Sequence, residues 1–380
     1  MSIDKLRADI DGIDSQLIDL FERRMQIALE VARYKKESGK PVFDNSRERQ
    51  LLHKVSGEID ADLEVYIRVF FSMLMDLSRS YQHKFLTDES KLRKRIEAAV
   101  EQTPKLFPEK AVVACQGAEG AYAQMACDKL FTTPNIMYFN TFEGVLKAVQ
   151  HGLCRYGVLP IENSTAGSVN QIYDLMQLHN VNITRTVRIQ ISHTLLVKDG
   201  TKLADVKEIF SHEQALTQCS AFLDTLKGVK VTLCENTAIA AQHVAESGRT
   251  DVAAISSKLC AEQYGLAVLA DGIQNNDANY TRFICVSNEL EIYPGANRTS
   301  LMMVIPHKPG SLYRVLVRFY ALGMNLVKLE SRPIQGRNFE FMFYFDVESS
   351  IYSPALMQLI CELENQIPDF RYLGSYTEVV

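Results

Sequence analysis

Hydrophobic residues recur every three or four positions through the start of the chain, at Ile3, Leu6, Ile10, Ile13, Leu17, Leu20, Ile27, Val31 and Tyr34. This spacing predicts one helix of about 35 residues with an apolar seam. We expect it to end at Ser38-Gly39-Lys40-Pro41, because glycine suits the C′ position and proline cannot continue a helix. Such a helix is about 50 Å long, which favours interlocking with a second chain. Two further helices are expected at residues 45–57 and 61–84.

The pattern changes after residues 85–109, which are highly charged and contain Pro104 and Pro108. We expect a solvated helix and a connector there. Beyond it, short apolar runs alternate with helical spacing, which predicts an α/β domain with largely parallel sheets. Polar loops in both halves of this domain favour two lobes around a cleft, as in periplasmic-binding-protein-like folds. The expected strands are 111–115, 136–139, 156–159, 194–197, 206–210, 230–234, 252–255 and 282–286.

The last part of the chain predicts strand 299–305, helix 311–322, strands 326–330 and 339–347, helix 354–366 and strand 370–376. This βαββαβ order is typical of a ferredoxin-like α+β unit. We therefore expect a multidomain chain. Its parts are an all-α domain at 1–90, a linker at 91–109, the α/β domain at 110–288 and the α+β domain at 298–380.

Composition excludes several classes of protein. The 380-residue chain has a net charge of −5 with mixed signs, which gives no reason to expect nucleic acid. It starts with an acidic amphipathic segment rather than a signal peptide, and no apolar run of about 18 residues could span a membrane. The eight cysteines are scattered, so we expect reduced core residues, no metal site and a cytoplasmic protein.

Arg24 interrupts the apolar seam between Leu20 and Ile27. A cation there needs a partner, and no acid of this helix shares its face well, so a bound anion is indicated. Lys35 lies close to the same face. Arg7 is about 25 Å from Arg24 along the helix, so one small ligand could contact both only if two antiparallel chains meet. For Arg7, a snorkelling surface cation is the simpler interpretation.

A polar loop, Pro160-Ile161-Glu162-Asn163-Ser164-Thr165-Ala166-Gly167-Ser168, follows the predicted strand 156–159 and opens a helix that reaches Leu178. Ligands bind at such strand-end loops in open α/β sheets, and a helix N-terminus suits a carboxylate or phosphate. An ordinary polar turn with a serine cap is the alternative. Four other loops, at 116–122, 211–218, 235–237 and 279–283, are each more simply a cap or turn when taken alone.

Together these loops, above all Thr281-Arg282-Phe283 and the segment Pro160–Ser168, resemble the prephenate dehydratase family. The resemblance implies that prephenate loses water and CO₂ without metal or cofactor. It makes Thr281 the proton donor or hydroxyl polariser, with Asn163 and Gln218 as neutral hydrogen-bond partners and Glu162 and Ser211 close by. The family often has hydroxyl residues where this chain has Ala121 and Ala123. We therefore expect backbone N–H groups, rather than side chains, to contact the ligand at this loop.

The helical part carries a second set of polar residues. Asp44 to Arg49 open the second helix with a cap and a mixed charge cluster, and Phe71, Leu74, Ser78 and Gln82 share a face of the third helix. A slip of one residue there would replace Ser78 with Leu77. This pattern resembles the all-helical chorismate mutases fused to prephenate dehydratases. The resemblance implies a chorismate pocket lined by Arg7 of a partner chain, Arg24, Lys35, Asp44, Arg47, Glu48, Ser78 and Gln82.

The C-terminal part carries the motifs Pro309-Gly310-Ser311-Leu312 and Glu330-Ser331-Arg332-Pro333. Both resemble the ACT-type regulatory domain of the same family. The resemblance implies that phenylalanine binds between two chains near Gly310, Ser311, Leu312, Glu330, Ser331 and Arg332. Ser311 stands where the family commonly has alanine. A dimerisation module without a ligand is the alternative.

The three resemblances follow the order of the bifunctional P-proteins. They imply a homodimer, open to higher assembly, that converts chorismate to prephenate and then to phenylpyruvate under inhibition by phenylalanine. Three alternatives stay open: a mutase module that is only a scaffold, a preference for arogenate, and a non-catalytic ligand sensor. The expected partners are these small molecules, without nucleic acid or membrane.

Overall fold

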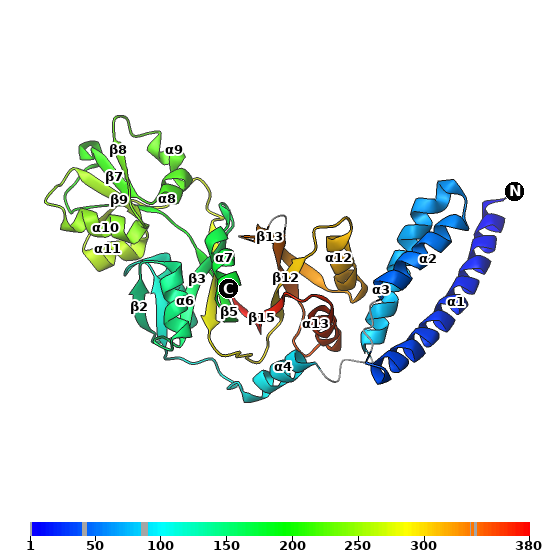
Figure 1. The fold of residues 1–380 in the computed structure, drawn as a ribbon. Coiled ribbons are helices and arrows are strands. Elements are labelled where there is room, and N and C mark those ends of the chain that lie inside the picture. Colours follow the sequence, from blue (N-terminus) through cyan, green and yellow to red (C-terminus); the bar gives the residue numbers. More distant parts are fainter. Residues whose placement is uncertain (1, 40–43, 85–89, 335, 338–339) are drawn as a thin grey trace. The chain divides into compact units, whose positions relative to one another are not determined.

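The computed structural model describes residues 2–39, 44–84, 90–334, 336–337 and 340–380. The chain forms two compact units (Figure 1). The first comprises residues 1–95, 304–325 and 352–370, and the second comprises 96–303, 326–351 and 371–380. Helices dominate the first unit, whereas the three sheets of the described residues draw their strands mainly from the second.

The first unit starts with the long helix α1 (Ile3–Glu37), whose 35 residues confirm the prediction from the seam. Ser38 is its C-cap, while Lys40 and Pro41 of the predicted stop lie outside the described residues. Ala28 and Ala32 are buried on the face that packs against α3, but the seam residues are exposed, from 40% at Val31 to 62% at Tyr34. An exposed apolar seam of this length is typical of a protein–protein interaction surface.

The remaining helices of the first unit also match their predictions closely. They are α2 (Asn45–Gly57), the short 3₁₀ turn η1 (Ala61–Leu63), α3 (Glu64–Lys84), α12 (Ser311–Ala321) and α13 (Pro354–Gln366). Helix α4 (Lys91–Gln102) occupies most of the expected linker at 91–109, and residues 85–89 before it lie outside the described residues.

The first lobe of the second unit is built on one mixed sheet. In the described residues its strand order is β16 (Glu378–Val379), β5 (Asn182–Gln190), β11 (Tyr280–Ser287), β3 (Tyr156–Asn163), β1 (Val112–Gln116) and β2 (Asn135–Phe139), with β4 (Gly167–Ser168) beside β3. Its helices are α5 (Tyr122–Leu130), α6 (Phe142–Gln150) and α7 (Asn170–Leu178).

The second lobe has its own sheet, with the order β10 (Ala267–Ala270), β6 (Thr194–Val197), β9 (Val252–Ser256), β7 (Glu208–Ser211) and β8 (Lys230–Leu233). Its helices are η3 (Leu203–Asp205), α8 (Glu213–Gln218), α9 (Ser220–Leu223), α10 (Thr237–Glu246) and α11 (Lys258–Tyr264). The two-lobed α/β prediction is confirmed. The prediction of largely parallel sheets was wrong, because the chain leaves the first lobe after β5 and returns through β11, which runs antiparallel to both β3 and β5.

A C-terminal sheet has the order β13 (Asn325–Pro333), β14 (Phe341–Glu348), β12 (Arg298–Ile305) and β15 (Phe370–Tyr376). With α12 and α13 the chain order is the predicted βαββαβ, although Phe339, the expected first residue of one strand, lies outside the described residues. Beyond β15, the unpredicted strand β16 joins the first-lobe sheet beside β5.

The C-terminal strands share a core with the first lobe. Met302, Tyr344, Leu373 and Tyr376 belong to the same buried hydrophobic cluster as Ile183 and its first-lobe neighbours. Gly374 has φ 142°, and a Cβ atom there would come within 2.2 Å of the Ile183 carbonyl oxygen. The close approach of β15 to β5 therefore requires glycine at this position. Among the described residues, no helix is both long and apolar enough to cross a membrane.

Candidate functional site

A cavity of about 340 Å³ lies between the two lobes of the second unit. Helices α5, α6, α7 and α10 all begin at its wall, where Tyr122, Phe142, Val169 and Thr237 line it. A helix N-terminus presents unpaired N–H groups and partial positive charge. The cavity therefore suits an anion, although the described residues that line it include neither lysine nor arginine.

Strands β3 and β11 place two polar residues side by side on the cavity floor. Thr281 is the register partner of Asn163, and Arg282 is the partner of Glu162. The register then shifts, so that Phe283 pairs with Pro160 and Ile161 is the extra residue. This β-bulge ends the regular pairing beside the site. Because side chains alternate along a strand, Thr281 and Phe283 line the cavity while Arg282 faces the other side of the sheet.

Thr281, Asn163 and Gln218 form one hydrogen-bond network, as the sequence resemblance implied they would lie together. Asn163 Nδ2 donates to Thr281 Oγ1 (2.9 Å), and Gln218 Nε2 is 3.5 Å from Asn163 Oδ1. The backbone N–H groups of Thr165 and Ala166 also donate to Asn163 Oδ1, which fixes the amide orientation. Since Thr281 Oγ1 accepts from an amide, its hydroxyl hydrogen can donate to a ligand in the cavity.

His193 extends this network but was not among the predicted site residues. Its Nε2 lies 2.8 Å from Gln218 Oε1, and it lines the cavity where the chain crosses from β5 to β6. Burial lowers the pKa of His193, partly offset by the hydrogen bond that His193 Nε2–H donates to Gln218 Oε1, and this shift favours the neutral imidazole. In the described structure His193 Nδ1 is buried without a hydrogen-bond partner.

Two predicted residues are placed differently. Glu162 faces the opposite side of the sheet from Asn163, where its carboxylate pairs with Arg282 and Lys328. Ser211 is fully buried and its hydroxyl donates to the Ile255 carbonyl of β9 (2.7 Å), so it serves the sheet rather than the cavity. Asn163 itself ends strand β3, whereas the sequence predicted a loop from residue 160 onward.

Further cavity residues come from the polar loops identified in the sequence, although the sequence predicted no function for these residues. Gln116, His212, Glu235 and Asn236 line the cavity at strand ends or helix starts. Helix α5 begins at Tyr122 with no side-chain cap, and the Gln124 N–H donates to the Ala121 carbonyl, so the N–H groups of Tyr122 and Ala123 are the ones that can donate to a ligand. The described residues hold no group of three His, Cys, Asp or Glu side chains placed to bind a metal.

In the first unit, Arg24 reaches the backbone of α3 one turn before Ser78, and Ser78 and Gln82 follow on α3. The guanidinium of Arg24 is half-buried and Nη1 donates to the carbonyl of Leu74, one turn before Ser78 (3.4 Å). Burial lowers the pKa of Arg24. Gln82 Nε2 donates to Ser78 Oγ (3.2 Å), and both side chains are buried. Ser78 and Gln82 therefore share one face of α3, as their four-residue spacing requires.

The predicted residues of α2 have structural partners. The Asp44 side chain caps α2 by accepting from the Arg47 N–H (3.0 Å), and Arg47 itself is exposed. Glu48 pairs with Arg79 of α3, which also pairs with Asp76. Arg79 was missed in the sequence, although its three-residue spacing from Asp76 is typical of a helical ion pair.

The two other α1 cations predicted for this site, Lys35 and Arg7, lie apart from Arg24. Lys35 follows eleven residues later and is half-buried. Arg7 is exposed and lies 3.9 Å from the Asp4 carboxylate. Within one chain Arg7 remains about 25 Å from Arg24 along α1, as the helix rise requires.

The predicted effector residues fall in both units. In the first, Gly310 has φ 78° and precedes Ser311 and Leu312 at the start of α12, a conformation that favours glycine. In the second, β13 turns Glu330 towards Ser168 and Arg332 towards Asp174, with both guanidinium–carboxylate distances 2.9 Å. Ser331 lies on the opposite, exposed face of β13. Because strand residues alternate between faces, Glu330 and Arg332 share one face of β13 and Ser331 lies on the other.

Comparisons with known proteins find relatives for both parts of the chain. The chain matches the family model for prephenate dehydratase at residues 113–291 and the one for chorismate mutase type II at residues 6–83. An Enterobacter agglomerans relative named bifunctional chorismate mutase/prephenate dehydratase is 31% identical over 382 residues, which cover 98% of this chain and 95% of the relative. The chain belongs to the bifunctional chorismate mutase/prephenate dehydratase family.

Relatives of this family extend the comparison. An Arabidopsis thaliana protein named arogenate dehydratase/prephenate dehydratase 2 is 35% identical over 276 residues, covering 70% of this chain and 72% of that protein. A solved structure of a prephenate dehydratase from Arthrobacter aurescens, in complex with L-Phe, has 30% identity and a TM-score of 0.64. It covers 70% of this chain and 89% of that one.

Proposed function

We propose that this protein converts chorismate to prephenate in its helical region and prephenate to phenylpyruvate in the cavity of its second unit. The observation that carries the proposal is the hydrogen-bonded set of Thr281, Asn163 and Gln218 in a cavity ringed by helix N-termini. That chemistry fits a substrate with two carboxylates and a hydroxyl leaving group.

In the dehydratase reaction the helix N-termini hold the carboxylates of prephenate, and the Thr281 hydroxyl donates to the ring hydroxyl. That hydroxyl takes the proton and leaves as water while the ring carboxylate leaves as CO₂, and the electron pair of the broken C–C bond completes the aromatic ring. A proton from solvent then restores the Thr281 hydroxyl. Threonine is a weak acid in water, so a preorganised cavity that excludes water must contribute much of the rate. Asn163 supports this role by donating to Thr281 Oγ1.

In the mutase reaction, a Claisen rearrangement, no group needs to bond to the substrate. Arg24 and an arginine from a second chain hold the two carboxylates of chorismate and fix its reactive conformer. Lys35 and Gln82 stabilise negative charge on the ether oxygen. In the alternative orientation of the Gln82 amide, in which Oε1 and Nε2 exchange places, the Ser78 hydroxyl donates to Oε1. Nε2 is then available to donate to the ether oxygen of the substrate.

The exposed seam of α1 supports an antiparallel homodimer in which Arg7 of one chain reaches the Arg24 site of the other. The seam residues are 40–62% exposed, and a second copy packed against the seam would remove this apolar surface from water. This arrangement resolves the separation of Arg7 from Arg24 along one helix. We place the protein in the cytoplasm, without a nucleic-acid or membrane partner.

We further propose that residues 298–380 form an ACT domain that binds L-phenylalanine and inhibits the dehydratase. The βαββαβ order and the left-handed Gly310 at the start of α12 support this assignment. The Arthrobacter aurescens relative was solved in complex with L-Phe.

Arogenate is a second candidate substrate for the cavity, because plant relatives are named arogenate dehydratases. Arogenate carries an ammonium group where prephenate has a keto group. Glu235 at the cavity wall could pair with that ammonium group.

The test is an assay of the purified full chain with chorismate, prephenate or arogenate, following each product separately with and without phenylalanine. The proposal predicts both steps from chorismate and suppression of phenylpyruvate formation by phenylalanine. Turnover of prephenate but not chorismate would reduce the helical region to a scaffold. Turnover of none of the three would make a non-catalytic sensor the better account.

A further inference from the structure

The Thr281–Asn163 pair has a second cross-strand pair directly next to it, formed by Arg282 and Glu162. The first pair faces the cavity and the second faces away from it. Arg282 Nε lies 2.9 Å from Glu162 Oε1. Thr281 is thus the chain neighbour of Arg282, and Asn163 is the chain neighbour of Glu162.

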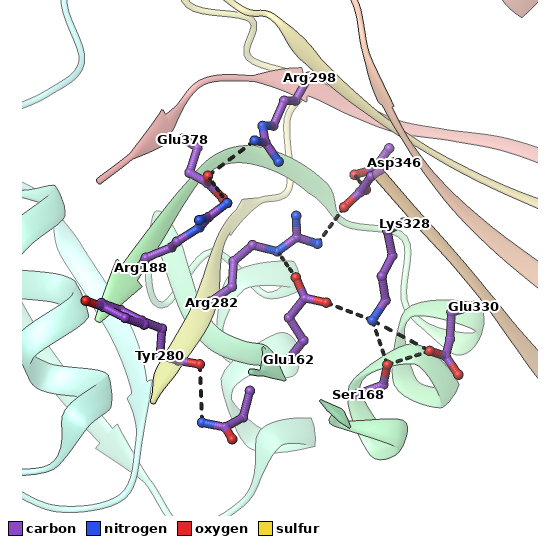
Figure 2. Close-up of polar contacts among 12 residues, drawn as sticks. Glu162, Ser168, Arg188, Tyr280, Arg282, Arg298, Lys328, Glu330, Asp346 and Glu378 are labelled. Carbon is purple, nitrogen blue, oxygen red and sulfur yellow. Dashed lines mark hydrogen bonds and ion pairs between the residues drawn. The ribbon is translucent and has the colours of Figure 1, made fainter. Parts of the chain in front are cut away.

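The charged pair is held from the C-terminal sheet (Figure 2). Arg282 Nη2 donates to Asp346 Oδ2 (2.5 Å), and Asp346 is fully buried on β14. Ser300 Oγ donates to the other oxygen of Asp346 (2.5 Å), so this carboxylate cannot turn away from Arg282 without losing a further bond.

Glu162 is held from the same sheet through a different strand. Lys328 Nζ of β13 donates to Glu162 Oε2 (2.7 Å) and to Ser168 Oγ (2.8 Å), and its side chain is 17% exposed. Lys328 and Asp346 both lie outside residues 113–291, the part that matches the dehydratase family. The C-terminal sheet therefore fixes both strands that carry the proposed catalytic groups.

We propose that Asp346 and Lys328 are positioning residues for the dehydratase, which hold Thr281 and Asn163 in register through Arg282 and Glu162. This inference rests on the proposed dehydratase function. Removing Asp346 leaves the buried Arg282 guanidinium with Glu162 as its remaining carboxylate partner, so we expect Arg282 to shift towards Glu162 and to displace strand β11. Small displacements of catalytic groups reduce turnover strongly, since the hydroxyl must meet its acceptor in a fixed geometry.

The test compares Asp346→Asn and Lys328→Met in the full chain with prephenate as substrate. Arg188→Gln is the matched control. Arg188 is the register partner of Arg282 on β5, and its ion pair with Glu378 (2.7 Å) ties the same sheet to the C-terminal segment. Figure 2 shows this pair beside, but separate from, the Glu162–Arg282–Asp346 chain.

We expect kcat to fall by up to about 100-fold in Asp346→Asn and less in Lys328→Met, with KM changing much less than kcat. Arg188→Gln keeps the wild-type kcat. The urea unfolding midpoint of each variant is measured as well. It shows whether a fall in kcat is explained by a general loss of folding stability.

A double-mutant cycle with Thr281→Ser separates positioning from general destabilisation. If Asp346 acts through Thr281, the loss caused by Asp346→Asn changes in the Thr281→Ser background; independent effects would multiply. Lys328→Met enters the cycle if Asp346→Asn does not fold. The inference is overturned if both Lys328→Met and Asp346→Asn keep the wild-type kcat. It is also overturned if the fold-losses in kcat of the single variants multiply in the double variant. Either result leaves the proposed function intact. Absence of prephenate turnover in the wild type would remove both.

Discussion

The cavity of the second unit and the polar face of α1 and α3 in the first unit differ in completeness. In the cavity, Thr281, Asn163 and Gln218 already bond to one another within one chain. On the helices, Arg24 reaches the backbone of α3 one turn before Ser78, but Arg7 remains exposed and far along α1. The sheet thus brings its polar residues together within one chain, whereas the proposed site on the long helices takes Arg7 from a second copy.

The reason lies in how each element brings distant residues together. Adjacent strands place partners about 5 Å apart whatever their distance in sequence, so Thr281 can meet Asn163 from 118 residues away. A straight helix separates its own residues by 1.5 Å for each position. Only another helix can complete a site on it, and the exposed seam of α1 offers a surface for that helix.

Thr281→Ala tests the self-contained cavity and has the largest expected effect. Dehydratase kcat should fall by about 10²–10⁴-fold, because the group that donates to the leaving hydroxyl is lost. Mutase activity should stay at the wild-type level. Steady-state assays with each substrate measure this, and Thr281→Ser, which keeps the hydroxyl, is the control. Unchanged dehydratase turnover in Thr281→Ala would remove Thr281 from the mechanism.

Arg24→Ala should have the converse effect on the helical region. Mutase kcat/KM should fall by about 10²–10³-fold, the cost of losing one charged donor, while the dehydratase is spared. Arg23→Ala changes the exposed neighbour and should behave like the wild type. An equal loss of both activities in Arg24→Ala would contradict separate sites.

Arg79→Met probes the ion cluster that holds Glu48 in the first unit. Removing the guanidinium leaves the buried Asp76 and the largely buried Glu48 without their shared partner, so unfolding free energy should drop by about 3–5 kcal/mol. Urea unfolding followed by circular dichroism measures this. Arg68→Met, at a half-exposed pair with Glu64, should cost only about 0–1 kcal/mol. Equal costs would show that the cluster adds no special stability.

His193 should give the smallest effect, on the pH dependence of stability. Burial lowers its folded pKa, so the unfolded chain takes up a proton first as the pH falls. Its contribution is present above the unfolded pKa and is lost as the pH falls through the folded value. Between about pH 7.5 and 5.5 the urea midpoint should fall less in His193→Gln than in the wild type. His151→Gln, at an exposed site, should leave the wild-type slope unchanged, and the same slope in His193→Gln would refute the assignment.

The sequence predicted α1, α2 and α13 closely because hydrophobic residues recur every three or four positions in each of them. Strand β5 was missed, although it is nine residues long. Thr184 and Thr186 are buried there beside Ile183 and Val187, so polar residues occupy interior positions and hide the alternation.

The site was predictable in its members but not in its geometry. Only the family resemblance joined Asn163 to Thr281, since no local pattern reveals a contact between strands so far apart in sequence. The separation of Glu162 from Asn163 depends on which face of β3 each residue takes, and on the bulge at Ile161. His193 belongs to no motif, because its role arises from the crossing between lobes.

The most direct test of the contrast between the two sites is to mix Arg7→Ala and Arg24→Ala chains and measure mutase activity. In a symmetric dimer with shared sites, each heterodimer has one intact site, so random mixing should restore about a quarter of wild-type mutase activity. Dehydratase activity should stay constant throughout. Mutase activity that remains at the level of the single variants, with heterodimers demonstrated by mass, would contradict a site shared between two chains.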